Sequence, residues 1–171
     1  MHTITVSKTI NIPKEKAWET ISDFQAIYKF HPDVESSPIQ NNIKRGLGAE
    51  RICTFYDGGS IGEKVTNFEE GESLTFDIVD TGPLPLKKAT AFISVRSVSK
   101  HKSAIDWRMD FDPKFGPLGW LMAKLVLKSK LKQVLTSIIK GVEDHVTTGK
   151  IVGPKGELQS ANAAVLFNSS N

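Results

Sequence analysis

The longest hydrophobic pattern in the chain lies near its C-terminus. Apolar residues recur there every three or four positions, which is the spacing of one face of an α-helix. Burying a stripe of this length contributes on the order of 10–20 kcal/mol, so the face needs an apolar partner. We therefore predict one long helix over Pro113–Thr148, lying on a sheet. The stripe consists of Leu127, Leu131, Val134, Leu135, Ile138, Ile139, Val142 and Val146.

The first part of this helix has a different apolar direction. Leu118 to Val126 project well over 90° away from the later stripe when a helix turns by about 100° per residue. A bend or break near Lys128 and Ser129 reconciles the two halves. Phe115 to Val126 then form a separately oriented segment, which we interpret as a candidate gate.

Alternating apolar and polar residues predict the sheet. A first strand is expected from Ile4 to Ile12, followed by short helices over Lys14–Ile21 and from Asp23 to Tyr28. A weak strand over Val34–Gln40 contains a proline, which is typical of a sheet edge. Five more strands follow, separated by glycine-containing or polar turns, so the class is α+β with one antiparallel seven-stranded sheet.

Turn residues predict the register of four hairpins, and all four place apolar residues on one face. With a turn at Gly58-Gly59, that face includes Tyr56 and Glu63, whereas Cys53 lies on the other. The loop from Gly82 to Leu86 is apolar and proline-rich, and is either a lid over a cavity or a packed corner. The predicted pairs are Tyr56–Ile61, Thr54–Glu63, Ile52–Val65, Val65–Phe76, Glu63–Ile78, Asn67–Leu74, Ile78–Ala91, Phe76–Ile93, Leu74–Val95, Val95–Trp107, Ile93–Met109 and Ala91–Phe111.

Composition narrows the class of protein. The 171 residues are 39% apolar and suit one domain, which we place at residues 1–149, with a polar extension over 150–171 that need not belong to the fold. There is no apolar run of about 18 residues and no signal-like N-terminus, so we expect a cytoplasmic protein. The net charge of +3 does not favour nucleic-acid binding. One cysteine and four separated histidines give no disulfide, metal or cofactor motif.

Glu63 is the strongest candidate for a functional residue. Its neighbours on the same face are Ile61 and Val65, so its carboxylate should point toward the helix. A charged group inside an apolar interior needs a partner or a wet cavity. Glu63 therefore either sits near the rim of the sheet, forms a structural pair with Lys8 or Arg51, or orients a polar group of a ligand.

Other candidates are weaker. His31 follows an aromatic group and precedes a proline, so it either caps a helix end or contacts a ligand. Tyr56 shares the predicted face with Glu63, and Cys53 is a poor candidate for a nucleophile. Glu63, Tyr56 and His31 are the candidate catalytic residues. The inward positions predicted to contact a ligand are Tyr56, Glu63, Phe76, Ile78, Ile93, Trp107, Met109, Phe111, Leu131 and Leu135.

Several stretches, in order over residues 3 to 148, make the chain similar to the START/Bet v (SRPBCC) superfamily and its polyketide cyclase/dehydrase and lipid-transport group. The resemblance implies a helix-grip fold, in which a curved sheet surrounds a C-terminal helix and leaves a cavity for a hydrophobic or aromatic ligand. It implies no universal catalytic set. The stretches are Ile10–Trp18, Ile21–Phe24, His31–Val34, Gly46–Arg51, Asp57–Gly59, Glu63–Val65, Gly82–Pro85 and Ala104–Trp107.

The sequence is compatible with three functions. The first is binding or carriage of a small hydrophobic ligand that is lipid-like or polyketide-like. The second is a cyclase or dehydratase in which cavity residues transfer protons. The third is transfer of a lipid or quinone with transient membrane contact through Trp120, Lys124 and Lys128, although these lysines are also consistent with an ordinary solvated face.

Overall fold

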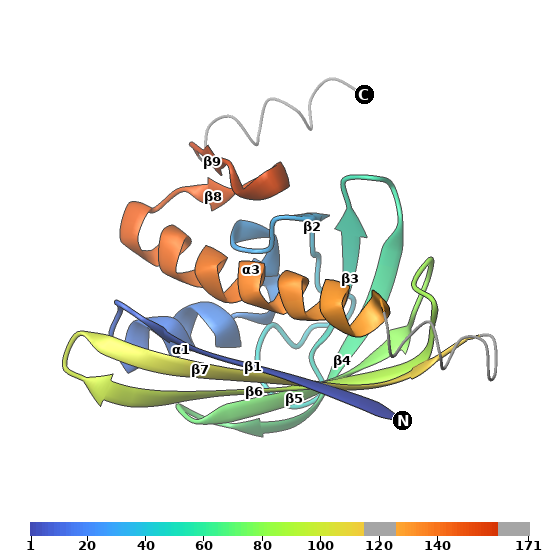
Figure 1. Cartoon of the computed structure of the whole chain (residues 1–171), viewed down its shortest axis with the longest axis horizontal. Helices are drawn as coiled ribbons and strands as arrows, with labels where there is room; N and C mark the ends of the chain where they lie inside the picture. Colours follow the sequence, from blue (N-terminus) through green and yellow to red (C-terminus); the bar gives the residue numbers. More distant parts are fainter. Residues whose placement is uncertain (115–125, 161–171) are drawn as a thin grey trace.

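A seven-stranded antiparallel sheet curves around one long helix, α3 (Lys128–Thr148), in the computed structural model (Figure 1). The structure describes residues 1–114 and 126–160. Neighbouring strands follow the order β1-β7-β6-β5-β4-β3-β2, which confirms the α+β helix-grip fold and places the weak strand β2 at an edge. The strands are β1 (His2–Ile10), β2 (Val34–Ser36), β3 (Glu50–Phe55), β4 (Ser60–Glu69), β5 (Ser73–Asp80), β6 (Leu86–Ser99) and β7 (Lys102–Pro113).

Two short helices connect β1 to β2, as predicted. Helix α1 (Lys14–Ser22) starts directly after Pro13 and buries Trp18 and its apolar neighbours. The 3-10 helix η1 (Phe24–Lys29) follows, and the backbone N–H of His31 closes it by donating to Ile27 O at 2.8 Å. These helices bring the segment from Phe30 to Val34 up to α3.

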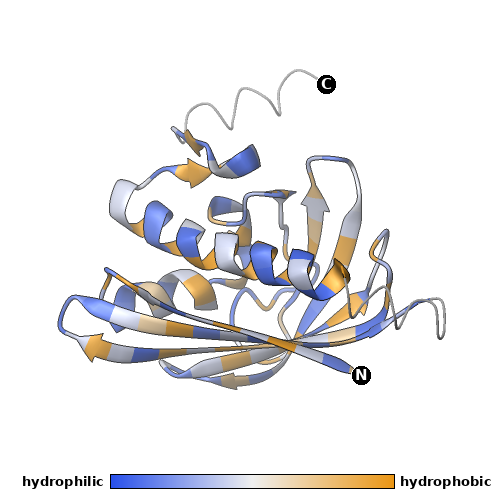
Figure 2. Cartoon of the chain, viewed as in Figure 1, coloured by the Kyte–Doolittle hydropathy of each residue, from blue (hydrophilic) through white to orange (hydrophobic). Residues whose placement is uncertain are grey.

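The alternation of hydrophilic and hydrophobic residues along the strands is visible in Figure 2. Across the β4–β5 turn, two predicted pairs are confirmed, whereas a bulge after Val65 pairs Leu74 with Phe68 instead of Asn67. The β5–β6 and β6–β7 registers differ from prediction by two residues. Because side chains alternate with a period of two, this shift exchanges partners but keeps the predicted inner face. The pairs found are Ile78–Ala89, Phe76–Ala91, Leu74–Ile93, Val95–Ile105, Ile93–Trp107, Ala91–Met109 and Ala89–Phe111.

The register predicted between β3 and β4 is wrong by three residues, and an odd shift reverses a face. The turn is longer than two residues, since the N–H of Phe55 donates to Gly59 O at 2.8 Å. Cys53 therefore pairs with Ile61, and Arg51 pairs with Glu63. Ile52 is 38% exposed, whereas Cys53 is 1% exposed, so β3 presents Arg51 and Cys53 to the interior.

Helix α3 buries the predicted stripe from Leu135 to Val142 against the sheet and α1. It ends at Gly149, whose φ of 69° is the left-handed conformation that favours glycine at a helix end. The α-helical part begins at Lys128, but Val126 and Leu127 directly before it are π-helical, so the break predicted near Lys128 and Ser129 stays a prediction. The candidate gate falls mainly on residues 115–125, which lie outside the described part.

The chain after α3 turns back onto the body of the protein (Figure 1). Strands β8 (Ile151–Val152) and β9 (Leu158–Gln159) form a small hairpin, with the 3-10 helix η3 (Pro154–Gly156) between them. Val152 is buried, and β8 contacts both α3 and η1. The start of the expected extension thus packs on the fold, whereas the division into domain and extension stays a prediction.

Gly141 lets α3 approach the chain that follows η1. A Cβ atom at this position would lie 1.9 Å from the carbonyl oxygen of Phe30, which is backbone and cannot rotate away. Overpacking of this kind costs about 1–3 kcal/mol or more, against a gain of about 1 kcal/mol in helix propensity. We expect Gly141→Ala to lower the free energy of unfolding by about 2 kcal/mol, measured by urea denaturation.

Ser137→Ala is the matched control, because Ser137 is exposed on the same helix. Its effect should stay within about 0.5 kcal/mol. A Gly141→Ala protein as stable as the wild type would show that the helix and the Phe30 carbonyl do not come this close.

Candidate functional site

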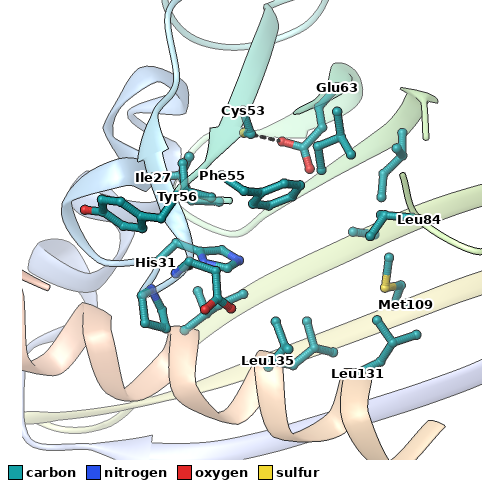
Figure 3. Close-up of a pocket in the computed structure, with 18 of the residues that line it drawn as sticks. Ile27, His31, Cys53, Phe55, Tyr56, Glu63, Leu84, Met109, Leu131 and Leu135 are labelled. Carbon is teal, nitrogen blue, oxygen red and sulfur yellow. Dashed lines mark hydrogen bonds between the residues drawn. The ribbon is translucent and has the colours of Figure 1, made fainter. Parts of the chain in front are cut away.

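A cavity of about 570 Å³ lies between the inner face of the sheet and α3 (Figure 3). This volume is within the range of sites for small organic molecules, about 300–1,000 Å³. Most of its wall is aliphatic or aromatic, and the polar groups are few. The lining residues are Ile27, His31, Pro32, Asp33, Val34, Cys53, Phe55, Tyr56, Asp57, Ile61, Glu63, Phe76, Ile78, Pro83, Leu84, Ala91, Trp107, Met109, Leu131, Val134, Leu135, Ile138, Pro154 and Lys155.

Most of the residues predicted to contact a ligand lie in this wall. Ile93 and Phe111 do not: they are buried in the core away from the cavity. The two-residue register shift explains the difference, because it places Ala91 rather than Ile93 beside Met109. Whether the remaining residues bind a ligand stays a prediction. They are Tyr56, Glu63, Phe76, Ile78, Trp107, Met109, Leu131 and Leu135.

Glu63 forms a buried ion pair with Arg51, one of the two partners considered for it. The Nε of Arg51 donates to Glu63 Oε2 at 2.6 Å, and the two side chains are only 3% and 6% exposed. Arg51 also donates through Nη1 to Phe24 O at 2.5 Å and lies 3.8 Å above the Phe24 ring centroid. These contacts compensate for burial of the guanidinium group. Glu63 is thus both paired and part of the cavity wall.

Cys53 lies beside this ion pair and lines the cavity, so its predicted outward orientation is wrong. Its thiol donates to Glu63 Oε2 at 3.3 Å (Figure 3). Burial raises the pKa of the Cys53 thiol well above its ordinary value, and the nearby Glu63 carboxylate raises it further. The thiol therefore stays neutral and is a poor nucleophile, because only the thiolate reacts.

His31 is held at the other side of the cavity by the backbone. Its Nδ1 accepts a hydrogen bond from the Asp33 N–H at 3.1 Å, so the neutral ring carries its proton on Nε2. Burial lowers the pKa of His31 to about 3, and the positive charge of Arg51 contributes to the shift. The imidazole points into the cavity in Figure 3. Within residues 1–114 and 126–160, no group accepts a hydrogen bond from Nε2.

Tyr56 lies at the mouth of the cavity rather than in its interior. Because the β3 face is reversed, its side chain is 41% exposed, and burial of the remainder raises the pKa of its hydroxyl. Asp33, Asp57 and Lys155 line the same opening and are exposed. Lys155 belongs to the hairpin after α3, so a segment that, by the sequence, need not belong to the fold supplies part of the rim.

The model of the family described as polyketide cyclase / dehydrase and lipid transport matches residues 1–143. The chain belongs to this family. Its members are ligand-binding or cyclase/dehydrase-type proteins, which agrees with the cavity described above. No curated protein matches the sequence significantly.

Solved structures share the fold of this family member. XoxI from Bacillus cereus is 20% identical, with 86% of this chain and 97% of its own covered and a TM-score of 0.71. A protein from Thermus thermophilus is 13% identical, covering 86% and 99% at a TM-score of 0.71. A mutant of Thalictrum flavum norcoclaurine synthase, bound to a transition-state analogue, is 14% identical, covering 86% and 95% at a TM-score of 0.67. At these identities the likeness extends to the fold alone.

The apolar loop between β5 and β6 contributes to the site of this polyketide cyclase / dehydrase and lipid transport family member. Pro83 and Leu84 of the apolar loop form part of the cavity wall, and the loop is fixed at Gly82, whose N–H donates to Asp80 Oδ1 at 3.0 Å. Among the described residues, no three His, Cys, Asp or Glu side chains are grouped to hold a metal ion. No described helix is long and apolar enough to cross a membrane.

Proposed function

We propose that this protein binds or carries a small hydrophobic or aromatic ligand in the cavity between the sheet and α3. The observation that carries the proposal is the composition of the wall: a volume of about 570 Å³ is lined mainly by apolar side chains. Burial of apolar area supplies most of the affinity in such sites, and a few polar groups orient the ligand. The family match supports a protein of this general kind.

We favour binding over catalysis because the candidate acid and base groups are occupied or poorly matched to that work. The Glu63 carboxylate accepts hydrogen bonds from both Arg51 and Cys53. With a pKa of about 3, His31 is a weak base near neutral pH, where a general base works best with a pKa close to the ambient pH. Tyr56 lies at the rim and is partly exposed. None of the three candidate catalytic residues is therefore well placed to transfer a proton near neutral pH.

Membrane contact gains no comparable support. Trp120 and Lys124 lie outside the described residues, and Lys128 is half-buried at the start of α3. Transfer between membranes thus remains an alternative use of the same cavity rather than the preferred proposal.

A neutral fluorescent probe, N-phenyl-1-naphthylamine, tests ligand binding directly. We expect saturable binding with one site per chain, detected by probe emission and by quenching of tryptophan fluorescence, since Trp107 lies in the wall. Ala91→Phe places a ring into the cavity from β6. The ring occupies space that the probe needs, so the bound probe would overpack the cavity at a cost of about 1–3 kcal/mol. The dissociation constant should therefore rise by about tenfold or more.

Ser94→Leu is the control, since Ser94 lies on the same strand but on its other face. This variant should bind the probe as the wild type does. Equal binding by the wild type and Ala91→Phe, or no saturable binding at all, would contradict the proposal.

A further inference from the structure

We propose that the ligand is uncharged at its buried end and carries a hydrogen-bond acceptor, such as a ketone or quinone carbonyl, that binds Nε2–H of His31. This inference rests on the proposed function, because it names the chemical class of the ligand in the same cavity. It follows from two separate properties of the wall, its charge balance and its fixed donor.

The charges on the inner wall cancel. Arg51 and Glu63 neutralise each other at 2.6 Å, and the Cys53 thiol beside them is protonated. His31 contributes no charge, since its ring is neutral. A ligand carboxylate or ammonium group at this depth would lose its hydration without gaining an opposite charge, which is costly. The exposed charges of Asp33, Asp57 and Lys155 lie at the mouth, where a charged end of a ligand keeps its contact with water.

The imidazole of His31 is a rigid donor. Its position is fixed by the hydrogen bond from Asp33 N–H to Nδ1, by its own N–H bonded to Ile27 O, and by Pro32 directly after it. The residue is 6% exposed, so only the cavity is open to Nε2. When a ligand fills the cavity, a donor in its wall loses contact with water, and that costs free energy unless the ligand supplies an acceptor. The apolar side chains that line the cavity, such as Leu135 and Ile138, make such a bond stronger than it is in water.

The same wall also accommodates a ligand hydroxyl. The Oε2 atom of Glu63 receives the Arg51 and Cys53 hydrogen bonds, whereas Oε1 receives none from the described residues. A hydroxyl group can donate to Oε1 without disturbing the ion pair. A neutral molecule with both a carbonyl and a hydroxyl group, on an aromatic or aliphatic frame, therefore fits this polar pattern.

Three naphthalenes of similar shape test the proposal. 2-Acetylnaphthalene offers a carbonyl acceptor, 2-isopropenylnaphthalene replaces that oxygen by carbon, and 2-naphthoate carries a charge. Their dissociation constants would be measured by calorimetry for the wild type, His31→Gln and His31→Asn. Glutamine can place an N–H near the position of Nε2, whereas asparagine can accept from Asp33 N–H as Nδ1 does but does not reach the cavity.

We expect the preference for the ketone over the alkene to fall by about tenfold in His31→Asn and to be retained largely in His31→Gln. 2-Naphthoate should bind the wild type most weakly. If the three proteins show the same ketone preference, or if 2-naphthoate binds as tightly as the ketone, the proposal is overturned while the proposed function stands. If neither neutral naphthalene nor the fluorescent probe binds the wild type, the proposed function itself is overturned.

Discussion

Replacement of Arg51 by methionine should lower the free energy of unfolding by about 3–5 kcal/mol, as measured by urea denaturation at neutral pH. The variant keeps much of the side-chain volume but leaves the Glu63 carboxylate buried without its cation. It also removes the hydrogen bond to Phe24 O and the stacking on the Phe24 ring. An unpaired buried charge is among the most destabilising changes a single substitution can introduce.

Two controls separate burial of charge from loss of packing. In Arg51→Met combined with Glu63→Leu, no charge is left in the wall, so most of the lost stability should return. Lys64 pairs with Glu50 on the neighbouring strands, but the two side chains are 47% and 37% exposed. Lys64→Met should therefore cost no more than about 1 kcal/mol. If Arg51→Met were as mild as Lys64→Met, the pair would not be shielded from water.

The fold follows from the sequence because the apolar alternation is repeated in every strand. An error of two residues in the β5–β6 or β6–β7 register does not change which side chains face α3, so that part of the inner face was predictable. The β3–β4 hairpin lacks this tolerance. Its longer turn shifts the strand by three residues and turns Tyr56 outward. In sequence alone, Tyr56 and Ile52 look more suitable for a core than Arg51.

The site was predictable only in part, for a related reason. Alternation was sufficient to point Glu63 inward, and Arg51 was one of two candidate partners. What makes a buried arginine acceptable is the Phe24 ring and carbonyl, which come from a different element. The contribution of Pro154 and Lys155 to the rim had no signal, because their segment follows the last helix and is mostly polar. These features depend on contacts between distant parts of the chain, which periodicity does not encode.

Acidification should destabilise the wild-type protein through His31. The pH range of this effect is set by the pKa values of His31 in the folded and the unfolded protein. The pKa of His31 is lowered from 6.5 to about 3, so below pH 6.5 the unfolded chain binds a proton that the folded protein excludes. The contribution of His31 to the free energy of unfolding is therefore fully present above pH 6.5. It decreases as the pH falls toward 3, by about 1.4 kcal/mol per pH unit. Between pH 6.5 and about 4.5 the contribution of His31 falls by about 3 kcal/mol.

Comparison with His31→Asn isolates this contribution. The substitution also changes packing, but the packing contribution should not depend on pH in this window, and asparagine itself does not titrate. His2, whose pKa is also lowered by burial, is present in both proteins and cancels in the difference. Urea denaturation from about pH 7.5 to 4.5 should give a difference between wild type and variant that decreases steadily below pH 6.5. Parallel pH profiles would mean that His31 is protonated as readily in the folded protein as in the unfolded chain. The cavity would then hold a cation beside Arg51 at mildly acidic pH, and the preference for an uncharged ligand would be confined to neutral and basic conditions.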